Sequence, residues 1–243
     1  MQRRRISRHS VKRHDMPRLG AAIGGLMWIP IAALAGALLG LPLLNLTRTL
    51  IASRVEAPCT SPLISEKAVY GWCGLNLTAF AIITSLLLTQ GALSVLFALL
   101  LFELMLALSA VDLIIRRIPN ELLLAMLLVF ALYKTASAGW ELTSSLLGAL
   151  AAGAVFILPS KFGLNIGWGD VKYAVILGFC FGLVGLLQIM LVMGVAMVGH
   201  LVYLYIRKKG TRKSLAAMGP YISLGAATAM VFPLLETLLN FKI

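Results

Sequence analysis

Apolar runs of roughly 20 residues dominate this chain, and a helix of that length is what spans the hydrocarbon core of a bilayer. The runs lie at 22–44, 69–89, 92–112, 120–138, 142–159, 171–186, 187–206 and 220–239. Apolar residues make up 60% of the chain and charged residues 12%, which excludes a soluble core with a wetted surface. The sequence predicts an all-α, polytopic integral membrane protein with about eight transmembrane helices.

Two parts of this pattern need a further argument. The stretch from 171 to 206 has no break as long as a loop, and we divide it near Gly185 because it is too long for one span. The first run follows a basic arm, yet it is longer than the core of a secretory signal and lacks a clear cleavage site. We expect a retained first helix after an arm at 1–19 that is too poor in apolar residues to fold.

Basic residues outnumber acidic ones, with 21 Lys and Arg against nine Asp and Glu and a net charge of +12. They gather in the arm and at helix ends, where they set orientation and contact anionic lipid headgroups. The bilayer, and not nucleic acid, is therefore the expected partner. Twelve of them lie in the connections at 45–68, 113–119, 160–172 and 207–213. The opposite connections hold Lys134 and Lys242, so the first set is predicted to face the cytoplasm.

The basic arm conflicts with this topology. With eight spans and those connections inside, the arm lies outside, although its seven Lys and Arg up to Arg18 argue for inside. Three explanations stay open, namely a re-entrant first helix, a span count that is off by one, and a true start at Met16 or Met27.

The three cysteines do not form a recognisable framework. Cys180 lies within an apolar run, and Cys59 and Cys73 stand fourteen residues apart without a Cys-x-x-Cys partner. A four-ligand zinc site is therefore not expected, whereas a disulfide between Cys59 and Cys73 stays open.

Two aspartates stand at ends of apolar runs that face the same side. Asp112 comes in the last turn of its run and is followed by Arg116 and Arg117, and then by Pro119 and Asn120, which open the next run. Pro119 sets φ for a tight turn and Asn120 can cap free N–H groups. A charge beside hydrocarbon is costly, so it needs a reason. A structural helix end and a functional carboxylate are both open for this segment alone.

The second aspartate, Asp170, follows Gly167, Trp168 and Gly169 and precedes Lys172. The two glycines leave the backbone free to adopt conformations closed to other residues, and they let a substrate peptide approach closely. Other polar residues in the runs are assigned structural roles. Glu103, nine residues before Asp112, falls on the opposite helix face. The remaining members of this structural group are Gln90, His200 and the small-residue run at 148–154.

These motifs resemble those of the type IV prepilin peptidases, which are membrane aspartic proteases of the GxGD class. Asp112 with its Pro-Asn turn is similar to the family's first catalytic motif, and the segment 167–172 is similar to the second. Met-Gly-Pro at 218–220 resembles the start of the family's last helix. The resemblance implies catalytic roles for Asp112 and Asp170. It assigns motif or substrate-approach roles to Gly167, Gly169, Lys172, Pro119, Asn120, Gly219 and Pro220.

The resemblance divides the chain into an arm at 1–19, N-terminal helices with a reduced cytoplasmic loop at 20–89, and a GxGD peptidase domain at 90–243. Larger members carry two Cys-x-x-Cys pairs in that loop, associated with methylation of the new amino terminus. Those pairs are absent from this chain. Asn45 and Arg48 resemble an Asn and an Arg at the end of the family's first helix, with different spacing. No cofactor is therefore expected for the peptidase activity. S-adenosylmethionine would be needed only if the methylation activity is retained.

The family implies cleavage of prepilin or pseudopilin precursors after the Gly that ends a short basic leader, at the cytoplasmic face of the inner membrane. Two adjacent carboxyls cannot both ionise cheaply, so the pair is expected to share a proton. The ionised member takes a proton from the attacking water, and the protonated member polarises the scissile carbonyl. No metal is required. The alternatives are a proton- or cation-coupled transporter, whose carboxylates should lie near the midplane, and an inactive relative that binds precursors.

Overall fold

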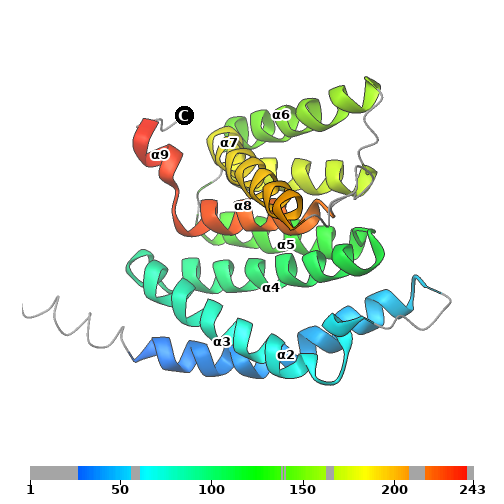
Figure 1. The fold of residues 1–243 in the computed structure, drawn as a ribbon. Coiled ribbons are helices and arrows are strands. Elements are labelled where there is room, and N and C mark those ends of the chain that lie inside the picture. The colour runs from blue at the N-terminus through cyan, green and yellow to red at the C-terminus, as the bar shows by residue number, and fades with distance from the viewer. Residues whose placement is uncertain are drawn as a thin grey trace, which may run out of the picture.

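The computed structural model describes residues 27–55, 61–137, 139, 141–162, 167–207 and 217–239, and these residues are helical with short connections and no strand (Figure 1). The basic arm at 1–19 and Cys59 lie outside the described residues. The elements are α2 (Trp28–Ala52), η1 (Pro62–Ile64), α3 (Ala68–Leu87), η2 (Leu88–Gln90), α4 (Ala92–Ile115), α5 (Asn120–Ala136), α6 (Leu142–Lys161), α7 (Trp168–Ile206), α8 (Gly219–Val231) and α9 (Leu234–Leu239).

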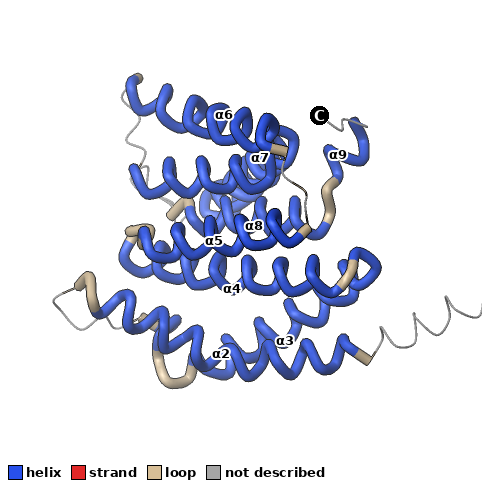
Figure 2. Tube along the Cα trace, turned by 180° about the vertical axis from the view of Figure 1, so that it is seen from behind, coloured by secondary structure: helices blue, strands red, loops and turns tan. Residues whose placement is uncertain are grey.

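The helices are stacked in layers (Figures 1 and 2). Helices α2 and α3 pack together on one side, α6 and the first part of α7 pack on the other, and α4, α5 and α8 lie between them. The largest fully buried side chains at the centre come from α4, α7 and α8, and include Met105, Leu108, Tyr173, Leu177 and Ile222. These three helices form the frame on which the predicted site residues are placed.

Five of the described segments are long and apolar enough to cross a bilayer. They are Trp28–Ala52, Ala68–Gln90, Ala92–Ile115, Leu142–Pro159 and Trp168–Ile206. Helix α5 has 17 residues and α8 has 13, which is short for a full span. The described residues therefore support a polytopic α-helical membrane protein but not the predicted count of eight spans.

Two predicted helix ends are wrong, and the predicted break near Gly185 is misplaced. The first helix does not end at 44 but continues to Ala52, so Asn45 and Arg48 lie inside it. The predicted helix at 220–239 is two helices, because Phe232 takes φ −129° and ψ 84° before Pro233. A residue before proline is pushed out of helical conformation, and proline has no N–H to continue the helix.

The long helix α7 begins at Trp168 and bends at Gly182, three residues before the predicted break. Gly182 has φ 69° and ψ −173°, a conformation open essentially to glycine alone. Beyond the bend α7 runs back along α8. Gln188 donates a hydrogen bond to the Phe232 carbonyl oxygen at 2.6 Å, and the His200 and Tyr221 rings lie 5.9 Å apart. The second half of α7 therefore returns toward the end where α8 begins.

Helices α6 and α7 approach closely at a pair of small residues. The backbones of Gly148 and Gly178 are so near that a Cβ on either would overlap the other's carbonyl. Close approach at small residues is the usual means of helix packing in membranes, where no hydrophobic force drives association. The packing surface predicted at 148–154 is thus part of the contact of α6 with α7.

Candidate active site

Asp112 and Asp170 lie at one end of the bundle, where α4 ends and α7 begins. Helix α4 ends at Arg116, which takes the left-handed conformation with φ 52° and donates its N–H to the Asp112 carbonyl oxygen at 2.9 Å. This conformation turns the chain sharply toward Pro119 and the start of α5. The Asp112 side chain is 5% exposed and therefore points into the protein.

The start of α8 holds the carboxylate of Asp112. The N–H of Gly219 donates to Asp112 Oδ2 at 2.8 Å. Met218, the residue before the helix, provides no side-chain cap, and Pro220 has no N–H to satisfy. Asp112 therefore caps the first turn of α8 from another helix, with its negative charge at the positive end of the helix dipole.

Asp170 is placed by the first turn of α7. The carbonyl oxygen of Gly167 accepts the N–H of Asp170 at 3.0 Å and that of Val171 at 3.2 Å, so the helix starts directly at the glycine. A carboxylate in this turn is favoured by the helix dipole. Asp170 Oδ1 is buried without a hydrogen-bond partner among the described residues. Such an acceptor is available to a water molecule or a substrate.

Both aspartates line one cavity of about 400 Å³. Its lining residues are Arg54, Asp112, Arg116, Arg117, Ile118, Asn120, Gly167, Trp168, Gly169, Asp170 and Lys172. The two carboxylates are close enough to interact electrostatically. Four cationic side chains surround them, so the cavity attracts electron-rich groups such as a carbonyl oxygen, and binding of a divalent cation is opposed.

One comparison with family models gave a match that includes the site. Residues 99–204 match the type IV leader peptidase family. The matched segment includes both aspartates and confirms the family resemblance drawn from the motifs. The comparisons with curated proteins and with solved structures gave no match.

Most of the predicted motif residues come together at this cavity. Gly167, Gly169, Lys172 and Asn120 line it with the aspartates. Lys172 Nζ donates to Asn120 Oδ1 at 3.2 Å, which ties the start of α7 to that of α5. Pro119 lies buried immediately before α5. Gly219 reaches the site through its hydrogen bond to Asp112, and Pro220 follows it in the first turn of α8.

Glycine is needed at two of these positions for space rather than for a special backbone conformation. The described glycines with positive φ are Gly91 and Gly182, so the unusual backbone conformations predicted at Gly167 and Gly169 are not observed. A Cβ at Gly169 would lie 3.0 Å from Ile118 Cβ. At Gly219 it would lie 2.7 Å from Asp112 Oδ2. Both glycines therefore permit the close approach of α7 and α8 to the end of α4.

A buried hydroxyl network lies one turn below the aspartates. Ser109 of α4 donates to Ser223 of α8 at 2.7 Å, and Tyr173 of α7 lies 2.7 Å from the same Ser223 oxygen. Each of these residues lies three or four positions from a site residue of its own helix. The pairs are Ser109 with Asp112, Tyr173 with Asp170, and Ser223 with Gly219. Hydrogen bonds between membrane helices contribute only about 0.6 kcal/mol on average. The network therefore acts mainly by fixing how far each helix extends toward the cavity.

Sequence reasoning missed some residues of the site. Arg54, just beyond α2, lines the cavity and forms an ion pair with Glu121 of α5. Tyr173, Ser109 and Ser223 were also missed. Their signal was a polar side chain three or four positions from a motif residue in an apolar run. Glu103, assigned a structural role, faces Asn76 of α3 and does not line the cavity.

The packing of Gly169 yields a testable contrast. We expect Gly169→Val to lower precursor cleavage by roughly a hundredfold, because its side chain would push the start of α7 from Ile118 and shift Asp170 by about 1 Å. Trp168→Phe should retain most activity, since Trp168 is 72% exposed. Cleavage is measured at equal membrane levels of the two variants. Equal activity would show that the space at Gly169 is not required for chemistry.

Proposed function

We propose that this protein is a membrane-embedded aspartic endopeptidase that removes the short basic leader of prepilin-like precursors after Gly, at the cytoplasmic face of the inner membrane. The main support is the pairing, in one cavity, of a hydrogen-bonded Asp112 with an Asp170 oxygen that has no partner among the described residues. Both aspartates lie at helix ends and not at mid-span. The carboxylates of a transporter are expected near the midplane, so this position favours a hydrolase.

In this proposal the pair of aspartates activates water and polarises the scissile carbonyl. The water lies between the carboxyls, and its proton passes to the ionised member as the oxygen attacks the carbonyl carbon. The protonated member gives its proton to the carbonyl oxygen as the C–O bond forms. The proton taken from water then passes to the amine nitrogen as the C–N bond breaks, and the re-forming carbonyl returns the first proton to its carboxylate. We assign these roles to the pair, because interacting carboxyls titrate together.

The charges around the cavity constrain how a precursor would lie. Arg54, Arg116, Arg117 and Lys172 would repel a basic side chain placed at the aspartates. We therefore place the basic part of the leader outside the cavity, along anionic headgroups, with the uncharged Gly at the dyad. The apolar helix of the precursor then continues into the bilayer.

Metal independence follows from the same charges. Reconstituted with a synthetic precursor whose leader ends in Gly, the protein should cut once after that Gly, as read by mass spectrometry of both products. EDTA or a zinc-selective chelator should change the rate by less than about twofold, because four cations oppose a metal at the dyad. Loss of cleavage on chelation, with recovery on adding zinc alone, would contradict the two-aspartate mechanism.

A further inference from the structure

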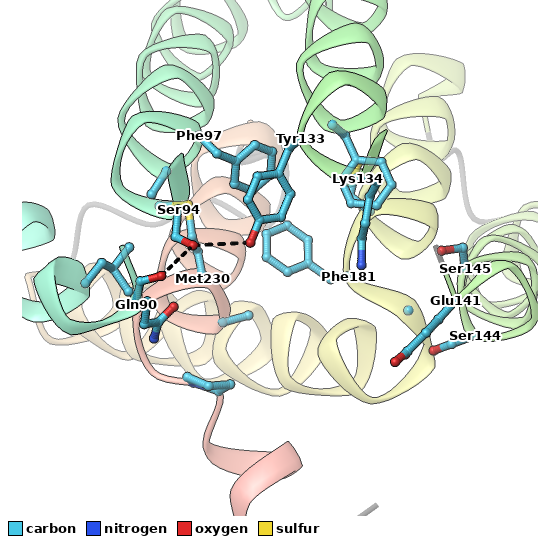
Figure 3. A pocket seen from close by; sticks show the side chains of 17 residues that line it. Gln90, Ser94, Phe97, Tyr133, Lys134, Glu141, Ser144, Ser145, Phe181 and Met230 are labelled. Carbon is cyan, nitrogen blue, oxygen red and sulfur yellow. Dashed lines mark hydrogen bonds between the residues drawn. The ribbon is translucent and has the colours of Figure 1, made fainter. Parts of the chain in front are cut away.

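A second cavity lies at the opposite end of the bundle from the aspartates (Figure 3). It has a volume of about 320 Å³ and is bounded by the start of α4, the end of α5, the start of α6, the bend of α7 and the α8–α9 connection. Because several helices begin or end here, the cavity lies at the membrane–water boundary. Its polar lining includes Gln90, Ser94, Tyr133, Lys134, Glu141 and Ser145.

Two opposite charges face this cavity without neutralising each other. Lys134 and Glu141 both point into it (Figure 3), and the ion pair found among the described residues is a different one, Arg54 with Glu121. The Lys134 ammonium lies 5.5 Å from the centre of the Phe130 ring. Among the described residues, Lys134 is also the one Lys or Arg at this end of the bundle. A basic residue on the side that is otherwise poor in Lys and Arg needs a reason.

Two serine hydroxyls in the cavity lack partners. A helical serine commonly donates to the carbonyl four residues earlier, as Ser94 does to Gln90 at 3.3 Å. Neither Ser144 nor Ser145 makes a side-chain hydrogen bond within the described residues, although Ser145 is only 5% exposed. Both hydroxyls are open to the cavity rather than enclosed by protein, so they are available to a ligand or to solvent.

The bend of α7 adds a further polar element. Phe181 and Gly182 line the cavity, and the second half of α7 starts at this bend. The start of a half-helix attracts anionic groups. The rest of the wall is apolar and includes Leu87, Ala98 and Met230. The cavity thus combines a cationic and an anionic side chain with an apolar surface.

We propose that this cavity binds the headgroup of a zwitterionic phospholipid such as phosphatidylethanolamine. The phosphate lies at Lys134 and the start of the second half of α7, and the ammonium lies at Glu141 and the serine hydroxyls. The upper acyl chain contacts Met230 and Leu87. Free phosphoethanolamine carries the same two charges, so the experiment includes it as the alternative source. The site lies apart from the aspartates and is independent of the proposed peptidase activity.

The test measures lipid binding to the delipidated full-length protein in detergent, by native mass spectrometry with phosphatidylethanolamine and with phosphatidylglycerol, which lacks the ammonium. Phosphatidylethanolamine should bind about tenfold more tightly. Glu141→Gln should abolish that preference, whereas Lys134→Gln should weaken both lipids about tenfold and Lys134→Arg should restore them. Glu66→Gln and Lys161→Gln, exposed charges outside the cavity, should change neither.

Competition separates the two sources of the headgroup chemistry. If free phosphoethanolamine displaces the phospholipid at equal concentration, the cavity takes the soluble zwitterion. If it does not, the acyl chain contributes and the ligand is the lipid. Equal binding of both lipids to the wild type, unchanged in Glu141→Gln and Lys134→Gln, would overturn the proposal. Thermal unfolding of each variant without lipid checks that these residues do not act through folding.

Discussion

Asp112→Asn and Asp170→Asn should each lower the cleavage of a matching precursor by at least roughly a thousandfold, while the protein should still insert and fold. An amide can neither accept a proton from water nor donate one as an acid, so both halves of the mechanism fail together. Because the two carboxyls act as a unit, the double variant should be no worse than either single one.

The fold should survive these substitutions. In Asp112→Asn the amide oxygen can still accept the N–H of Gly219, which spans 2.8 Å in the wild type. In Asp170→Asn the backbone bonds to Gly167 are unchanged. Extraction as a monodisperse species and unchanged thermal unfolding provide the control. Glu103→Gln, outside the cavity, should give a milder loss. Near wild-type cleavage in either aspartate variant would refute the peptidase proposal.

Gly219→Ala should have the second largest effect. The added Cβ would lie 2.7 Å from Asp112 Oδ2 and 3.1 Å from Asp112 Cβ and Cγ, so either α8 or the carboxylate must move. Movement lengthens the Gly219 N–H bond to the carboxylate, and a displacement of about 1 Å costs roughly a hundredfold in rate. Gly219→Val should be worse, because its two methyl groups enlarge the overlap.

Gly74→Ala is the matched control for this prediction. Gly74 is an exposed helical glycine in α3, and a Cβ there meets nothing within 4 Å. Cleavage by Gly74→Ala should match the wild type. The rate of precursor cleavage and the thermal unfolding of both variants are compared at equal membrane levels. Equal rates for Gly219→Ala and Gly74→Ala would mean that the Gly219–Asp112 contact does not position the carboxylate.

Part of the fold could not be predicted because hydropathy is insensitive to helix geometry. The stretch from 171 to 206 has no loop-like break, and only the conformation of Gly182 shows where it turns back. The segment 220–239 is apolar enough for one span, but Pro233 ends it early. Helix α2 continues past its apolar run, and in this extension Arg48 donates to the carbonyl oxygens of Ile64 and Ser65.

The sequence by itself determined the membrane class, the helical architecture and the two aspartates with their flanking motifs. These are local properties, since the length of an apolar run and the residues beside a carboxylate are read from neighbouring positions. Only the tertiary structure decided that Gly219, 107 positions after Asp112, supplies its hydrogen bond. The structure likewise brought Ser94 and Glu141, which are 47 positions apart, to one cavity. Contacts of this kind depend on how helices cross, which is set by packing at small residues and bends rather than by local pattern.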